Sequence, residues 1–278
     1  MLAVGSLALT GCGQKNQSNP NAGKGGGTTS KSAPLQDLNI KSRDEVKDGG
    51  TVRFSIDTLP TTWNALHIDG DTVDLGTTIM GFVGANNFDI AEDGTPKPDT
   101  DYLQSYDVQT NGGKQVVTLH LNPKARWNSG RTIDYTDYQA TWKANNGANE
   151  DFKMASSDGF NQIESVKKGD KDTDVVITYK ATYPDWTATW SSVMPKEGVG
   201  TPETFNNGWK QFKPEWFTGP FTLDRIDQAQ KTLYLKRNPN WWGEKAKLDT
   251  VSFRAMDPAT KSKAFANKEI DVVDDIIT

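Results

Sequence analysis

The feature that most constrains this chain is its only cysteine, Cys12, which follows an apolar run from Leu2 to Leu9. An apolar run that ends in small residues just before a lone cysteine is typical of a processing site and not of a folded element. The alternative is a short buried strand with a core cysteine. If Cys12 is modified, no thiol remains for a disulfide, and the fold must be stabilised by core packing.

The segment after Cys12 argues against the buried strand. Residues 13–41 are rich in Gly, Asn, Ser, Thr and Lys, with Gly25-Gly26-Gly27 in the middle. Such a segment cannot bury enough apolar surface to fold, and it is typical of a flexible tether. The sequence therefore predicts a signal peptide over 1–11, a tether over 12–48 and a folded part that begins at Gly49.

Leu9-Thr10-Gly11-Cys12 resembles a bacterial lipobox. The resemblance implies that Cys12 becomes an acylated N-terminus, carrying palmitate or similar chains, on the outer face of the cell membrane. Stable anchoring of this kind needs more than one acyl chain. No Lys or Arg precedes the apolar run, so a start of the signal peptide upstream of Met1 stays open. No stretch reaches the roughly 18 apolar residues of a membrane span, so we expect the membrane contact to be the lipid anchor alone.

Composition and motifs argue against several classes of function. The net charge is -5, which disfavours nucleic acid as a partner. The chain has 2 His, His67 and His120, which lie far apart, so the sequence predicts no metal site. No G-x-S-x-G, H-E-x-x-H or Cys–His nucleophile pattern is present. We therefore expect no catalytic residues and no cofactor, and the protein is predicted not to be an enzyme.

The folded part alternates strands with single helices. Residues 51–56 alternate in polarity and predict a half-buried strand. Residues 106–108 and 116–121 flank Asn111-Gly112-Gly113-Lys114, a hairpin signal. Asp134 can cap a helix that carries Tyr135, Tyr138 and Trp142 on one face and ends near Asn145-Asn146-Gly147. This mixture predicts an α/β or α+β fold and not a doubly wound nucleotide fold.

The remaining elements continue the same pattern. A strand is predicted over 175–179, a short helical stretch near Trp186 and a long crossover over 194–216. Strands follow at 219–223, 232–236 and 248–254. Asp257 caps a helix with Pro258 at its first position, and residues 270–273 are predicted to form a closing strand.

Several short motifs follow one another in a fixed order from residue 49 onwards. They are Gly49-Gly50-Thr51-Val52, residues 119–130, Phe217-Thr218-Gly219-Pro220-Phe221, residues 235–243, Lys247-Leu248-Asp249 and residues 265–272. This series resembles the extracellular solute-binding proteins of family 5, the oligopeptide- and dipeptide-binding components of ABC importers. One departure is Lys268, which stands where the family usually has Gly, so Asn267 or Lys268 must end the helix before it. Trp241 and Trp242 are expected to cover the edge of the sheet.

The resemblance implies a mixed α/β, periplasmic-binding-protein-like class II clamshell. Lobe I would comprise 49–82 and 201–278, with an inserted subdomain over 83–200. The second lobe would begin just after Ile277, so the chain resembles the front half of a member. The protein is expected to be a monomer that captures oligopeptides or dipeptides and delivers them to ABC transporter permease subunits.

Ligand-contacting residues are predicted in two loops that face the cleft in the family. The first loop follows the first strand and the second precedes the strand at 219–223. Trp63 can instead be a core residue, and His120 is expected on a solvated strand face. The predicted residues are Thr61, Trp63, Asn64, His67, Thr218 and Gly219.

Two further functions stay open. The first is that of a lipoprotein of the same fold that binds another cargo, such as a glycan, a metal chelate or a lipid headgroup. The second is that of an envelope-synthesis regulator that kept the clamshell without transport.

Overall fold

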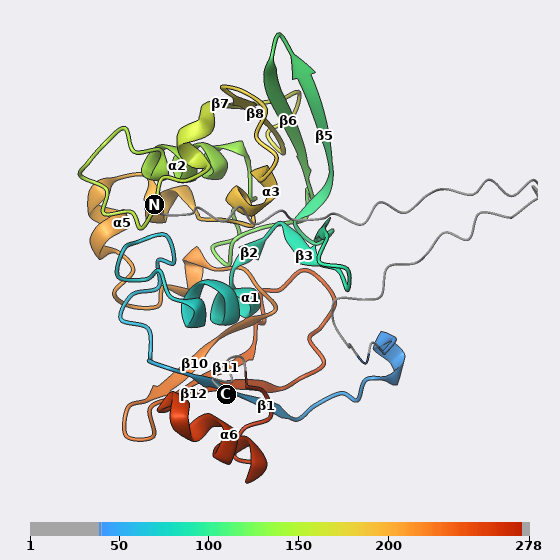
Figure 1. Cartoon of the computed structure of the whole chain (residues 1–278). Coiled ribbons are helices and arrows are strands. Elements are labelled where there is room, and N and C mark those ends of the chain that lie inside the picture. The colour runs from blue at the N-terminus through green and yellow to red at the C-terminus, as the bar shows by residue number, and fades with distance from the viewer. Residues whose placement is uncertain (1–38, 40, 274–278) are drawn as a thin grey trace, which may run out of the picture.

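The computed structural model describes Asn39 and residues 41–273, and it contains two four-stranded sheets, one above the other in Figure 1. Cys12, the predicted signal peptide 1–11 and most of the predicted tether 12–48 lie outside the described residues. The described end of that tether packs on the folded part. It contains a single 3₁₀ turn, η1 (Arg43–Glu45), where Nε of Arg43 lies 2.8 Å from a carboxylate oxygen of Glu244. Further along, a carboxylate oxygen of Asp48 lies 2.7 Å from a guanidinium nitrogen of Arg237.

The lower sheet joins the beginning of the described chain to its end. Its order is β1-β12-β11-β10, with β1 parallel to β12 and the other pairs antiparallel. The predicted strands are confirmed as β1 (Thr51–Ile56), β10 (Phe221–Asp227), β11 (Thr232–Arg237) and β12 (Thr250–Ala255). The closing strand predicted over 270–273 was wrong, because the described residues there form only one parallel bridge, between Phe54 and Val272. The backbone N–H groups of Asp271 and Val272 both donate to Arg53.

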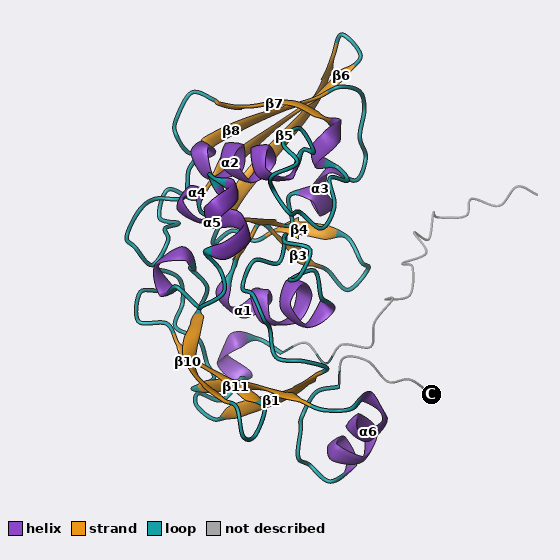
Figure 2. Cartoon of the chain, turned by 90° about the vertical axis from the view of Figure 1, so that its left-hand side faces the viewer, coloured by secondary structure: helices purple, strands orange, loops and turns teal. Residues whose placement is uncertain are grey.

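Helices lie on both faces of the lower sheet (Figures 1 and 2). On one face a π-helical turn, η2 (Asp74–Ile79), continues into α1 (Met80–Val83). Phe82 of α1 packs edge-on against Phe253, which stacks on Phe54 at 5.2 Å between ring centroids. α6 (Pro258–Ala266) lies on the opposite face, with Asp257 as the predicted cap.

The upper sheet is antiparallel throughout and local in sequence. Its order is β5-β6-β8-β7, and its strands are β5 (Leu103–Asn111), β6 (Lys114–Leu121), β8 (Asp174–Tyr179) and β7 (Ile163–Lys168). The predicted hairpin is confirmed. Gly112 and Gly113 both have positive φ, 59° and 81°, which is the backbone geometry that a two-residue hairpin turn requires.

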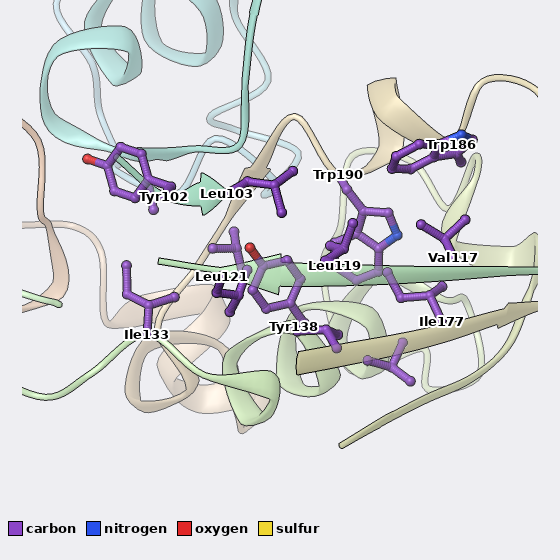
Figure 3. Close-up of a cluster of buried hydrophobic side chains, with 14 of the residues drawn as sticks. Tyr102, Leu103, Val117, Leu119, Leu121, Ile133, Tyr138, Ile177, Trp186 and Trp190 are labelled. Atoms are coloured by element: carbon purple, nitrogen blue, oxygen red, sulfur yellow. The ribbon is translucent and has the colours of Figure 1, made fainter. Parts of the chain in front are cut away.

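The helix α2 (Tyr135–Asn145) packs against the upper sheet as its pattern predicts. Asp134 and Asp137 form the capping box. Tyr138 is fully buried, while Tyr135 and Trp142 pack against the same core at its rim. Figure 3 shows Tyr138 and Trp190 facing the apolar side chains of the sheet. Their rings lie 5.3 Å apart between centroids.

Asp137 also fixes the surroundings of α2. It is fully buried and accepts a bidentate pair from Arg131 at 2.6 and 3.0 Å. The indole N–H of Trp127 and the backbone N–H of Lys196 donate to the same carboxylate. Although burial raises the pKa of Asp137, these donors stabilise its charged form. A capping residue recognised from sequence is therefore also the centre of a buried network.

Short elements link the two sheets. Trp241 and Trp242 were expected to cover the sheet edge, but they pack against Tyr102 of the upper core, 5.4 Å between the Tyr102 and Trp242 ring centroids. The reason is that the residues after β11 run along the boundary between the two cores. The remaining short elements are β2 (Ala85–Asn86), β3 (Phe88–Ile90), β4 (Pro96–Pro98), η3 (Phe160–Gln162), α3 (Trp186–Thr189), β9 (Ser192–Val193), α4 (Lys196–Val199), α5 (Pro202–Asn207) and η4 (Pro214–Trp216).

Candidate functional site

We call the upper sheet together with the elements packed against it the upper unit, and the lower sheet with its helices the lower unit. A hollow of about 310 Å³ lies where the loop after β1 meets loops and short elements of the upper unit. We refer to it as the junction groove. Its walls come from three stretches of chain: residues 65–71, residues 155–160 and residues 183–192. Side chains that line it include Leu66, Asp71, Ser156, Asp158, Phe160 and Ser192.

A short antiparallel bridge holds two walls of the junction groove together. His67 pairs with Met154. The backbone N–H of Ile68 donates to Lys153 at 3.0 Å, and that of Ala155 donates to Leu66 at 2.9 Å. The groove therefore depends on contacts between segments about ninety residues apart in sequence.

The groove wall combines apolar side chains with polar ones, and its charged side chains are negative. Asp71 and Asp158 line it together with serine and threonine hydroxyls, and no Lys, Arg or His side chain is among its lining residues. A second hollow of about 560 Å³ shares Ala188, Ser191 and Ser192 with the groove. Asp99 lines that second hollow, where burial and then the nearby carboxylates raise its pKa to about 6. Both hollows therefore favour ligand groups that donate hydrogen bonds or carry positive charge.

None of the predicted residues of the first loop lines the groove, although Ala65, Leu66 and Asp71 of the same loop do, and three of the four predicted side chains are buried. Trp63 packs edge-on against Phe212, 4.7 Å between ring centroids, as a core residue would. The side-chain amide of Asn64 donates to Phe205 and its carbonyl accepts from Leu66. Thr61 is exposed. Ligand contact by Thr61, Trp63, Asn64 and His67 stays a prediction.

The second predicted loop joins the two units. Thr218 donates its hydroxyl to the carbonyl of Arg126 at 2.6 Å, and its backbone N–H donates to Val83. Gly219 allows a close backbone approach, because a Cβ atom there would lie 2.2 Å from the carbonyl oxygen of Phe82. The structure thus supplies a packing reason for both residues, and their contact with a ligand stays a prediction.

Sequence reasoning missed the lining residues that come from the upper unit. Asp158 lies in a turn and Ser156 in the loop before it, while Ser191 lies in a bend and Ser192 begins the two-residue strand β9. Polar residues in turns are common, so no local pattern separates these from other surface turns. Only the way the chain brings the turns beside residues 65–71 gives them a shared position.

The comparisons with known proteins agree with this architecture. The family model named bacterial extracellular solute-binding proteins, family 5 Middle, matches residues 96–278. The chain belongs to this family. Its relatives are solute-binding proteins and not enzymes, and the family's extracellular assignment supports a position outside the cytoplasm. Among the residues that the structure describes, no helix has the length and apolarity needed to cross a membrane.

Three relatives illustrate the range of cargo in the family. The oligopeptide-binding protein OppA of Mycobacterium tuberculosis is 32% identical over 276 residues, which are 96% of this chain and 45% of that protein. LpqW of the same species, named a probable monoacyl phosphatidylinositol tetramannoside-binding protein, is 26% identical over 176 residues, 63% of this chain and 27% of that protein. The structure of the periplasmic EDTA-binding protein EppA matches with a TM-score of 0.73 at 26% identity, covering 82% of this chain and 43% of that one.

The predicted fold class is confirmed by these matches. The chain has the mixed α/β architecture of the class II clamshell proteins of family 5. It spans less than half the length of OppA and EppA. His120, expected on a solvated strand face, is partly exposed there and lies between Asp107 and Asp174, 3.1 and 2.9 Å from its ring nitrogens.

Proposed function

We propose that this chain is part of an extracytoplasmic solute-binding protein that captures oligopeptides or dipeptides and delivers them to the permease subunits of an ABC importer. Family membership supports solute binding, and the 32% identity to OppA supports peptide cargo. Lobe I would comprise 49–82 and 201–278, and 83–200 would form the inserted subdomain. In this assignment β1 and β12, from the two parts of lobe I, pair in one sheet.

The charge of the junction groove is the observation that carries the peptide proposal. Asp71 and Asp158 face a hollow whose lining contains no basic side chain. A peptide presents a free ammonium group at its N-terminus and backbone N–H groups along its length, which suit carboxylate and hydroxyl acceptors. A polyanionic chelate such as EDTA would face repulsion from the same wall.

Calorimetry on the full-length protein tests this proposal. A short peptide should bind more tightly than its N-acetylated form, which lacks the ammonium group. Asp71→Asn and Asp158→Asn should each weaken binding of the free peptide about two- to fivefold, as expected for an exposed charge pair, and should leave the acetylated peptide unaffected. Asp170→Asn, an exposed carboxylate in the turn between β7 and β8, is the matched control. Equal affinity for both peptides in every variant would contradict the role of the groove.

The membrane anchor is part of the same proposal. Cys12 would carry the acyl chains that hold the protein, as a monomer, at the outer face of the cell membrane. Cys12→Ser should move the protein from the membrane fraction to the soluble fraction of its host. Persistence of the variant in the membrane fraction would refute the anchor.

A second candidate is a protein of the same fold that binds a glycolipid headgroup. The similarity to LpqW, whose name gives a mannosylated phosphatidylinositol as its probable cargo, favours this candidate. Mass spectrometry of the small molecules that co-purify with the full-length protein separates the two candidates. A mixture of short peptides supports peptide capture, whereas a single glycolipid supports the second candidate.

A further inference from the structure

His67 lies at the point where the loop after β1 is fastened to the upper unit. Only 4% of its surface is exposed. Its backbone forms the bridge to Met154, and the hydrogen bonds of Ile68 and Ala155 lie on either side. Leu66 and Ala155, which this bridge brings together, both line the junction groove. The environment of the His67 ring therefore bears directly on the shape of the groove.

Only one of the two ring nitrogens of His67 has a hydrogen-bond partner among the described residues. Its Nδ1 atom accepts a hydrogen bond from the backbone N–H of Asp69 at 3.0 Å. A neutral ring that accepts at Nδ1 must carry its proton on Nε2. Nε2 is buried without a hydrogen-bond partner among the described residues, and the ring of Phe205 lies 6.0 Å away between centroids. Because this surrounding is apolar, it penalises a charged ring more than a neutral one.

Three charged side chains face the ring. Asp69, from the same loop, has a carboxylate oxygen 3.7 Å from Nδ1 and favours the charged form. Lys153, on the bridged segment, and Lys210, after α5, disfavour the charged form of the ring. Burial has the largest effect, and together these influences lower the pKa of His67 below its ordinary value.

We propose that His67 is a pH-sensitive latch on the junction groove: the neutral ring holds the loop after β1 against residues 153–155, and protonation releases it. A second proton must go to Nδ1, which then can no longer accept the hydrogen bond from the Asp69 N–H. Instead, the new Nδ1–H and the backbone N–H of Asp69 point at each other, and neither has an acceptor there. The charged ring is also driven out of its apolar surrounding. This inference concerns the regulation of the site in the proposed function and rests on that function for its biological meaning.

The sign of the pH dependence follows from linkage. Because folding lowers the pKa of His67, the unfolded or released loop binds the proton more readily. The stabilisation is fully present above the ordinary histidine pKa of about 6.5, and it is lost as the pH falls through the lower pKa of the latched state. Acid should therefore open the loop, and neutral pH should close it.

Hydrogen exchange in the full-length protein tests the latch without any ligand. The amides of Ile68 and Ala155 report on the bridge, and their protection factors, corrected for intrinsic exchange, are compared at pH 7.5 and 5.0. Protection should fall in acid, by up to about tenfold for each pKa unit by which the latched state lowers the pKa. His67→Asn keeps an acceptor near the Nδ1 position but does not titrate, so its protection should not change with pH.

The other histidine provides a matched control. His120→Asn removes a histidine from the upper sheet, and the acid opening at Ile68 and Ala155 should persist in that variant. Because the chain has 2 His, the same variant also assigns the ring signals of the wild-type protein in a nuclear magnetic resonance titration. The ring of His67 should titrate below about 6.5. A His67 ring that titrates at or above that value, or protection that does not change with pH in the wild type, would overturn the latch.

Peptide calorimetry over the same pH range separates this inference from the proposed function. Peptide affinity that falls in acid for the wild type but not for His67→Asn supports both. Acid opening at Ile68 without any peptide binding keeps the latch and refutes peptide capture. Peptide binding with no change in protection refutes the latch alone.

Discussion

The two sheets differ in how far apart in sequence their strands lie. The upper sheet is built from residues 103–179, and its neighbouring strands are all antiparallel. The lower sheet pairs Thr51 with Thr250 in parallel, across the whole upper unit. Local pairings require little loop closure, whereas the parallel pair forms only when distant parts of the chain meet. The upper sheet is therefore specified by its own segment, and the lower sheet depends on the entire described chain.

The two histidines extend this comparison to pH. His67, at the junction, is buried and has a lowered pKa. His120, on the upper sheet, is hydrogen-bonded to Asp174 and to Asp107. Both carboxylates raise its pKa, and Asp174 has the larger effect. Acid should thus loosen the junction while it strengthens the upper sheet. The same residue type acts in opposite directions because one ring is surrounded by apolar atoms and the other by carboxylates.

Removal of Phe253 should produce the largest effect and should separate the two sheets. Its side chain is fully buried between Phe54 and Phe82 in the lower core. Phe253→Ala should lower the free energy of unfolding by about 3–5 kcal/mol, measured by urea denaturation. Amide exchange should rise in β1 and β12 while β6 and β8 stay protected. Phe265→Ala, at a side chain that is 51% exposed, is the control and should be nearly neutral. Equal loss of protection in both sheets would show that they unfold as one unit.

Asp137→Ala should have the next largest effect, this time in the upper unit. It leaves the partly buried Arg131 without its bidentate partner and removes the acceptor for Trp127. We expect the free energy of unfolding to fall by about 3 kcal/mol, with exchange rising first in α2. Asp170→Ala removes an exposed carboxylate and serves as the control. A change below about 1 kcal/mol would mean that the network adds little beyond the cap.

The local elements were predictable from sequence and the junction was not. The Gly112-Gly113 turn and the Asp134 cap act within a few residues of chain, so their patterns identified the hairpin and α2. The placement of β1 and β12 in one lobe came from the family resemblance and not from any local pattern, and their parallel pairing was not predicted. Trp241 and Trp242 were misplaced, since nothing near them in sequence indicates Tyr102 as their partner.

The candidate site shows the same limit. The loop that contains residues 61–67 was chosen because it follows the first strand and faces the cleft in the family that the sequence resembles, and Ala65, Leu66 and Asp71 of that loop do line the junction groove. The side chains of Trp63 and Asn64 are nevertheless buried, because each has a packing or hydrogen-bond partner far along the chain. Asp158 and Ser192 were missed, since their place in the groove depends on tertiary contacts alone.

The effect of His120→Asn should be smaller and should depend on pH. His120 joins β5, β6 and β8 through Asp107 and Asp174. Folding raises its pKa, so its stabilisation is present below the ordinary pKa and is lost as the pH rises through the higher value. Because the side chain is 36% exposed, solvent screening limits the effect to under about 1 kcal/mol. Urea denaturation at pH 5.5 should show the variant to be less stable than the wild type, and the difference should vanish at pH 9. A stability difference between the two proteins that grows with pH would mean that folding lowers the pKa of His120 and does not raise it.

Lys268→Gly should produce the smallest change, a gain in stability confined to the lower unit. After α6 the chain turns at Lys268, whose φ is 60°, while Asn267 keeps a negative φ. The left-handed conformation costs a residue with a side chain roughly 1–2 kcal/mol, and glycine avoids that cost but loses more backbone entropy on folding. The net gain should be about 0.5 kcal/mol, measured as a higher urea midpoint with an unchanged slope. Asn267→Gly is the control and should not stabilise the protein, because its backbone is already in an ordinary region. Stabilisation by Asn267→Gly and not by Lys268→Gly would move the helix end by one residue and contradict the geometry at Lys268.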